Sequence, residues 1–225
     1  MKATDKAVSF LPKRIIPWIS EGKGERRFEA VVAFADVSGF TKMSEQLATI
    51  GHEGAETLTA ILNSYFTEMI NRIKRDGGFV GKFGGDAMTI FFPVEDTEKS
   101  HEVALRAVST CLDLQQKMVD FQDVKTKAGS FSLGMKIGIA LGSVLFRVVG
   151  PERDGGKEFL LAGIPLDLAA DAEHHGSSGQ VIVSTEIASN CNLEDSPVGD
   201  GFYLVNPAIK LDPPHFIDRT LSIDS

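Results

Sequence analysis

The order of strand and helix patterns along the chain limits its possible folds more than any other feature. Residues 28–37 (FEAVVAFADV) are rich in Val, Phe and Ala, which is typical of a buried strand. Two helices are expected next, followed by short strands at 79–83 and 87–92 and a second long helix over 97–122. With strands following at 131–150, this β-α-β-β-α-β order predicts an α+β fold with a ferredoxin-like core, its long helices on one face of a mostly antiparallel sheet.

The remaining segments complete a single-domain interpretation. Gly142 and Ser143 are expected to divide the stretch from 131 to 150 into two strands. The residues after 156 alternate strand and helix patterns and predict a C-terminal α/β extension. We therefore expect an N-terminal arm over 1–27, one domain over 28–205 and a C-terminal tail over 206–225.

Composition excludes several classes of protein. The formal net charge is -8 and no block of Lys and Arg is present, so nucleic acid is not an expected partner. Two cysteines are too few for a zinc site, and a disulfide is not expected between them. The chain has no signal peptide pattern and no apolar run of about 18 residues, so we expect a cytoplasmic protein without a membrane anchor.

Asp36 ends the first predicted strand, in the phrase FADVSGF. The glycine at 39 lets the backbone turn tightly into the next helix, for which Ser38 and Thr41 are suitable caps. The amides of residues 38–41 would open this helix, and such amides attract phosphates. Alone the pattern is weak, because Asp at a strand end is common and often serves only as a helix cap.

Asp86 follows two glycines in the expected turn of the hairpin, KFGGDAM. An Asp in a turn most often makes a local hydrogen bond to the backbone. In the ferredoxin-like plan, however, the first strand and the hairpin are neighbours, which predicts that Asp36 and Asp86 lie close together at one edge of the sheet. Two such carboxylates repel each other, and a pair of Mg²⁺ ions, a frequent device of phosphoryl chemistry, would relieve that repulsion.

The phrases FADVSGFTKMSE and KFGGDA, about fifty residues apart, together resemble the class III adenylyl/guanylyl cyclase catalytic domain. More narrowly, the chain is similar to the first, metal-aspartate domain of soluble bicarbonate-type adenylyl cyclases and their large bacterial relatives. The phrases LPKRIIPWIS and KEFLLAGIPLD fit that subgroup, and the resemblance runs from about Leu11 to Phe202.

The resemblance implies a reaction and a set of site residues. Asp36 and Asp86, assisted by the Val37 carbonyl, would hold two Mg²⁺ or Mn²⁺ ions. The ribose 3′-oxygen of ATP would attack the α-phosphorus, giving cyclic AMP and releasing pyrophosphate. Without the resemblance, Lys136 would be interpreted as an exposed strand lysine. The residues implied to bind the triphosphate are Ser38, Gly39, Phe40, Thr41, Gly84, Gly85 and Lys136.

The chain departs from the family pattern on one helix. A complete site in this family lies between two domains, the second of which supplies an Asn and, four residues later, an Arg. Asp167 and Asp171 occupy those positions in PLDLAADAEHH, and neither supplies the cation that stabilises charge on the transferring phosphorus. The resemblance therefore implies one half of an enzyme, which needs a second cyclase domain and is nearly inactive alone.

A regulatory site is implied less directly. Lys82 matches a lysine that contacts bicarbonate at the pseudo-symmetric, non-catalytic site of the bicarbonate-type enzymes, and Leu161 and Ala170 match other positions of that site. Ala170 stands where the family has an arginine, and Lys82 is equally well interpreted as a strand residue with an exposed ammonium group. Bicarbonate is therefore only a possible ligand.

Two further functions compete with the enzyme half. A degenerate cyclase domain would bind nucleotide or a partner without turnover, although two close carboxylates are not needed for that. A diguanylate cyclase would carry an acid after the turn, whereas this turn reads Gly-Gly-Asp-Ala-Met. The choice between ATP and GTP stays open, because the residues that read the base are expected on the partner.

Overall fold

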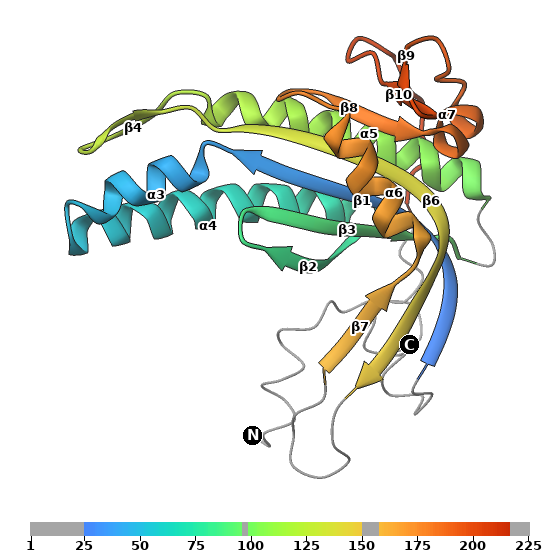
Figure 1. Ribbon diagram of the computed structural model, residues 1–225, viewed down its shortest axis with the longest axis horizontal. Coiled ribbons are helices and arrows are strands. Elements are labelled where there is room, and N and C mark those ends of the chain that lie inside the picture. Colours follow the sequence, from blue (N-terminus) through green and yellow to red (C-terminus); the bar gives the residue numbers. More distant parts are fainter. Residues whose placement is uncertain (1–24, 96–98, 150–157, 217–225) are drawn as a thin grey trace.

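The computed structural model describes residues 25–95, 99–149 and 158–216 (Figure 1). Almost all of the predicted N-terminal arm and the end of the tail lie outside these residues. The elements are β1 (Glu25–Ser38), α3 (Phe40–Ala48), α4 (His52–Arg75), β2 (Phe79–Gly84), β3 (Ala87–Pro93), α5 (Ser100–Met118), a 3-10 turn (Val119–Phe121), β4 (Val124–Thr126), β5 (Gly129–Phe131), β6 (Gly134–Val149), β7 (Glu158–Ala162), α6 (Ile164–His174), β8 (Val181–Ser184), α7 (Thr185–Cys191), β9 (Pro197–Gly199) and β10 (Phe202–Leu204).

The main sheet has the strand order β2-β3-β1-β6-β8-β10-β9, with β7 paired to the far end of β6. Every pairing is antiparallel except that of β6 with β8. The two central strands, β1 and β6, are paired from Glu25–Arg147 to Ser38–Gly134 and run side by side over the whole length of β1 (Figure 1). The predicted α+β class with a mostly antiparallel sheet is confirmed.

The two faces of the sheet carry different layers. On β1, the odd-numbered residues from Val31 to Val37 pack into the core beneath α3, α4, α5 and α7. The even-numbered Ala30 and Val32 pack on the other face against Ala169 of α6. Because strand side chains alternate between faces, α6 and the long helices contact opposite sides of the same strands. No helix among the described residues is both long and apolar enough to cross a membrane.

The predicted break at Gly142 and Ser143 is wrong, because β6 is one continuous strand of 16 residues. Gly142 pairs with Ala30 inside the ladder, and a side chain there would contact Pro165 at the start of α6 at 3.4 Å. That is an ordinary van der Waals distance, so Gly142 lies within the strand close to α6 and makes no turn. The short β4–β5 hairpin and the β9–β10 pair were not predicted, since three-residue strands carry too little periodicity.

The first part of the predicted tail is held on the domain. Ile209 and Leu211 pack against the core beneath the long helices. The ring of Phe216 lies 5.3 Å from the guanidinium of Arg106 and directly against Gly77, where an added Cβ would meet it at 2.6 Å. Residues 206–216 thus return to the turn that follows α4, so the boundary proposed at 205 does not mark the end of the packed structure.

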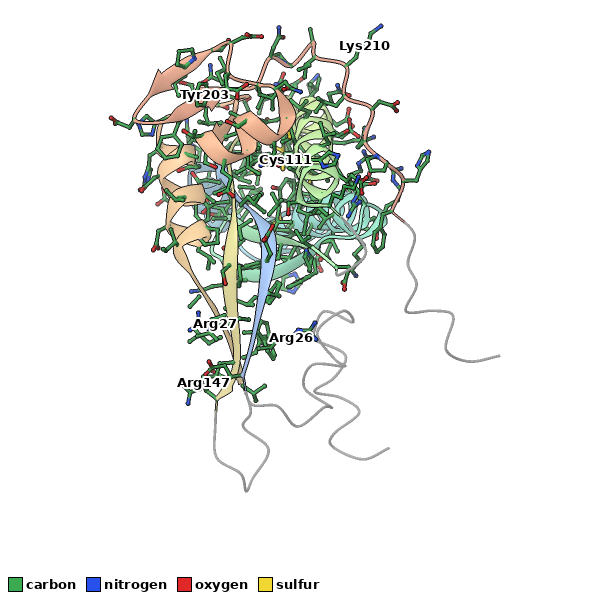
Figure 2. The ribbon with its side chains drawn as sticks, turned by 90° about the vertical axis from the view of Figure 1, so that its right-hand side faces the viewer. Arg26, Arg27, Cys111, Arg147, Tyr203 and Lys210 are labelled. Atoms are coloured by element: carbon green, nitrogen blue, oxygen red, sulfur yellow. The ribbon has the colours of Figure 1, made fainter. Side chains whose placement is uncertain are left out.

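Both cysteines are buried, and neither forms a disulfide. Figure 2 shows Cys111 within the packed body of the molecule, far from Arg26, Arg27 and Arg147 at the end of the β1–β6 pair. Burial raises the pKa of the Cys111 thiol and raises that of Cys191 to about 12.

Neither thiol is therefore expected to react with Ellman's reagent at pH 8 in the native chain, because reaction needs an accessible thiolate. Two thiols should titrate after unfolding in guanidinium chloride, which provides the control. Rapid stoichiometric labelling of one thiol in the native chain would contradict the burial of both.

Candidate active site

Asp36 and Asp86 lie at the same end of two neighbouring inner strands, and not at an edge of the sheet as predicted. The pairing of β1 with β3 ends at Ala35–Met88, whereas its pairing with β6 continues to Ser38. Asp86 occupies the two-residue turn after Gly84, in which Gly85 has φ +68°. This tight turn places the Asp86 carboxylate beside the last residues of β1, because β3 enters the sheet next to β1.

The electrostatics of Asp36 show how crowded the site is with negative charge. Its half-buried carboxyl has a raised pKa, first because burial disfavours the ionised form. The charges of Glu173 and Asp86 raise this pKa further, while Lys136 and His174 lower it. A bound cation would relieve this repulsion, so the site is electrostatically suited to a divalent metal ion.

Glu173 is a site residue that the sequence analysis did not single out. It is 2% exposed on α6, and its Oε1 lies 2.7 Å from Nζ of Lys136, the residue that pairs with Asp36 across β1 and β6. The contact is ionic only, since its angles do not make a hydrogen bond. Gly138 permits this arrangement, because a Cβ there would lie 2.0 Å from the Ala169 carbonyl oxygen. Lys136 is thus engaged by a buried carboxylate instead of being freely exposed.

The loop after β1 turns into α3 through Gly39. Its φ is +89°, and a Cβ would lie 2.4 Å from the carbonyl oxygen of Ser132, so only glycine fits. The expectation that Ser38 or Thr41 caps this helix is wrong: Gly39 is the N-cap, and no side chain makes a cap hydrogen bond. The first amides of α3 therefore have no capping side chain, as an anion-binding helix start requires.

A pocket of about 310 Å³ opens between this loop, the Asp86 turn and α4. The buried ring of Tyr65, on α4, forms part of the pocket wall. Tyr65 is the second site residue that the sequence analysis did not single out, because its position fits the apolar stripe of the helix. Asp86 lines the pocket, so the contents of the pocket are in reach of this ligand of the candidate metal site. Its lining residues are Val37, Phe40, Thr41, Ser44, Ile61, Leu62, Tyr65, Phe66, Gly85, Asp86 and Leu133.

The donor set fits a metal that is only partly held by protein. Within the described residues, no group of three or more His, Cys, Asp or Glu side chains is arranged to bind a metal ion. Two aspartates beside a backbone loop instead supply hard oxygen ligands and leave positions open. Mg²⁺ commonly binds in this way, through one or two carboxylates, waters and substrate phosphates.

None of the residues assigned to the regulatory site or to the missing Asn and Arg lines the pocket beside Asp86. Lys82 is exposed on β2, and its neighbour Gly81 contacts the Leu161 side chain of β7. Ala170 is half-buried on α6. On the same helix Asp167 and Asp171 are both exposed, so their charges are solvated.

Comparison with solved structures places this fold. The chain superimposes on the adenylyl cyclase CyaB from P. aeruginosa with a TM-score of 0.64 at 24% identity, covering 81% of this chain and 96% of that one. The guanylyl cyclase Cya2 gives a TM-score of 0.63 at 23% identity, covering 85% and 100%. The guanylate cyclase domain of RhGC from Catenaria anguillulae, solved in complex with GTP, gives 0.61 at 23%, covering 80% and 98%. These similarities show the class III cyclase fold.

Sequence comparison adds the family. Adenylate cyclase type 10 of Mus musculus is 27% identical over 195 residues, which cover 85% of this chain and 12% of that protein. An adenylate cyclase of Anabaena cylindrica is 29% identical over 147 residues, covering 65% of this chain and 27% of the relative. The chain thus spans only a fraction of the length of these relatives. The model of the adenylate and guanylate cyclase catalytic domain matches residues 24–203, and the chain belongs to this family.

Proposed function

We propose that the chain is the metal-supplying half of a nucleotidyl cyclase that converts ATP to cyclic AMP and pyrophosphate. The observation that supports this most is the placement of Asp36 and Asp86 at the same end of neighbouring strands, close enough for the charge of one to raise the pKa of the other. A domain used only for pairing would gain nothing from such a costly arrangement.

The chain's own residues divide the work at this end of the sheet. Asp36 and Asp86, with the Val37 carbonyl, bind two Mg²⁺ or Mn²⁺ ions. The amides at residues 38–41 and the Gly84–Gly85 turn bind and orient the triphosphate, because a side chain blocks neither. When bound, the two ions supply charge stabilisation at the attacking 3′-oxygen and at the phosphates.

The proposed enzyme needs a second cyclase domain. Asp167 and Asp171 are exposed acids on α6, so a second copy of this chain would present negative charge where the family requires Asn and Arg. Large apolar side chains are also exposed on β2, on β7 and at the start of α6. They are suited to burial against a partner domain. These side chains are Phe83, Leu160 and Ile164.

The test is a complementation assay. The purified chain alone should form little cyclic nucleotide from ATP or GTP with Mg²⁺ or Mn²⁺. Mixing it with a cyclase domain that carries the Asn and Arg but lacks the two aspartates should raise the rate by at least about 100-fold. The reason is that the two domains together supply all the charge-stabilising groups of the site. Robust cyclic AMP formation by the chain alone would contradict the half-enzyme proposal, and GTP turnover would correct the proposed substrate.

The alternative function is a degenerate cyclase domain that binds nucleotide or a partner without turnover. The ion pair of Lys136 with Glu173 favours this alternative, because it partly neutralises a cation that the family uses on phosphate. Nucleotide binding in the complementation assay without any product would support it. The bicarbonate site stays a prediction that rests on Lys82 and lacks the family's arginine at Ala170.

A further inference from the structure

The hydroxyl of Tyr65 is a buried donor without a hydrogen-bond partner. Tyr65 is 3% exposed on α4, and its Oη has no partner among the described residues. Buried polar groups are nearly always paired, and leaving one unpaired costs about 1–3 kcal/mol. An apolar residue would fill this position at no such cost, so the hydroxyl calls for an explanation.

The ring of Tyr65 is held by its neighbours. Phe66 packs edge-on at a centroid distance of 5.0 Å, and Phe121 packs edge-on at 5.5 Å. Such contacts on two sides keep the hydroxyl from swinging out to solvent. Any partner must therefore come to it from the surrounding groups.

The charged groups that act on the Tyr65 hydroxyl are the two aspartates of the candidate metal site. Burial raises the pKa of Tyr65, and the charge of Asp86, followed by that of Asp36, raises it further. A tyrosine phenol is protonated at neutral pH in any case, so it can donate a hydrogen bond. Tyr65 also lines the same pocket as Asp86, whereas Asp36 lies on the opposite face of β1 with α6.

The other polar side chains of that pocket, Thr41 and Ser44, are neutral hydroxyls and therefore weaker acceptors than a carboxylate. The Ser44 hydroxyl also donates its proton to the Thr41 carbonyl at 2.8 Å. The turn that carries Asp86 is open, since a Cβ on Gly84 or Gly85 would meet nothing within 4 Å. The turn is therefore not packed against described side chains at these two glycines.

We propose that Tyr65 is a positioning residue whose hydroxyl donates a hydrogen bond to the Asp86 carboxylate when that carboxylate binds a divalent cation. One oxygen then faces the metal and the other accepts from Tyr65. Hydrogen bonds of this kind fix metal-ligating side chains, and their loss typically lowers metal affinity about 10- to 100-fold. The inference rests on the proposed function, because it needs Asp86 to be a metal ligand.

The test compares two conservative variants of the full chain. Tyr65→Phe removes only the hydroxyl, and Tyr203→Phe makes the same change at the other tyrosine, which lies on β10 (Figure 2). Mn²⁺ binding is followed by electron paramagnetic resonance, and thermal unfolding is measured with and without Mn²⁺. We expect Tyr65→Phe to weaken Mn²⁺ binding at least about 10-fold while leaving metal-free stability unchanged or higher. Tyr203→Phe should alter neither property.

A third variant locates the acceptor. In an Asp86→Asn background, Tyr65→Phe should weaken Mn²⁺ binding no further, because the hydroxyl acts through Asp86. If the wild-type chain binds Mn²⁺ and Tyr65→Phe binds it with the same affinity, the inference about Tyr65 is overturned while the proposed function is not. A full additional loss in the Asp86→Asn background would assign the hydroxyl to another acceptor. Absence of Mn²⁺ binding by the wild-type chain would overturn the metal-supplying function itself, and the inference with it.

Discussion

Replacing Asp36 or Asp86 by Asn is expected to lower the cyclase activity of the complemented enzyme by about 1,000-fold or more. That loss corresponds to about 4 kcal/mol at 1.36 kcal/mol for each tenfold change. The physical reason is that an amide gives a metal ion a weaker, neutral ligand, while the reaction relies on charge stabilisation by the bound ions. The measurement is kcat/KM with ATP and Mn²⁺ at saturating partner domain.

Loss of activity must be separated from loss of structure. Because the folded state raises the pKa of Asp36, the ionised form of this group lowers stability at neutral pH, and the penalty disappears as pH falls below the ordinary carboxyl range. Asp36→Asn should therefore leave the melting temperature of the metal-free chain unchanged or higher. Asp167→Asn, the same change on the exposed face of α6, is the matched control and should keep full activity. Substantial turnover in Asp36→Asn would refute the metal assignment.

The largest expected change in stability comes from Lys136→Met. Glu173 is 2% exposed, so removing Lys136 leaves a buried carboxylate whose remaining ionic contact is with His174 at 3.8 Å, a group charged only when it is protonated. Breaking one side of a buried pair typically costs 3–5 kcal/mol, and about 3 kcal/mol is expected here because Lys136 is 28% exposed and water can enter. In a domain of this size, that should lower the melting temperature by about 6–12 °C.

The double variant Lys136→Met/Glu173→Leu distinguishes an unpaired charge from simple loss of packing. Since replacing both members of a buried ion pair with apolar residues is often neutral or stabilising, the double variant should recover most of the lost stability. Calorimetry of the metal-free chain measures all three proteins. If Lys136→Met melts like the wild type, Glu173 does not depend on Lys136, and the pair is not an element of stability.

Most of the fold was predictable because its long elements carry clear periodicity. The helices α4 and α5 and the strand at residues 28–37 were placed to within a few residues. The error at Gly142 arose because a glycine inside a strand pattern often marks a turn or a break. Only the ladder with β1, in which Gly142 pairs with Ala30, shows that the strand continues, and that pairing joins residues distant in sequence.

The sequence analysis found the site residues whose type is fixed by function and missed those whose place in the site depends on tertiary packing. Asp36 stands out in the sequence because it ends a strand pattern, and Asp86 because it follows paired glycines. Glu173 was missed, although an acid at position i+4 from Ala169 on the buried face of α6 was a signal. Tyr65 was missed for a different reason: its place in an apolar stripe hides the hydroxyl, and only the structure shows that the hydroxyl has no partner.

The long ladder between β1 and β6 has a consequence for how insertions and deletions in this chain would act. Asp36 and Val37 are neighbours, yet one belongs to the α6 face and the other to the core beneath the long helices. Deleting a single residue from β1 would shift the strand by one position and exchange these roles, burying the carboxylate and exposing the valine. The alternation of side chains along β1 thus determines both where the metal site lies and which residues enter the hydrophobic core. The fold should therefore tolerate substitutions in β1 far better than a change in its length.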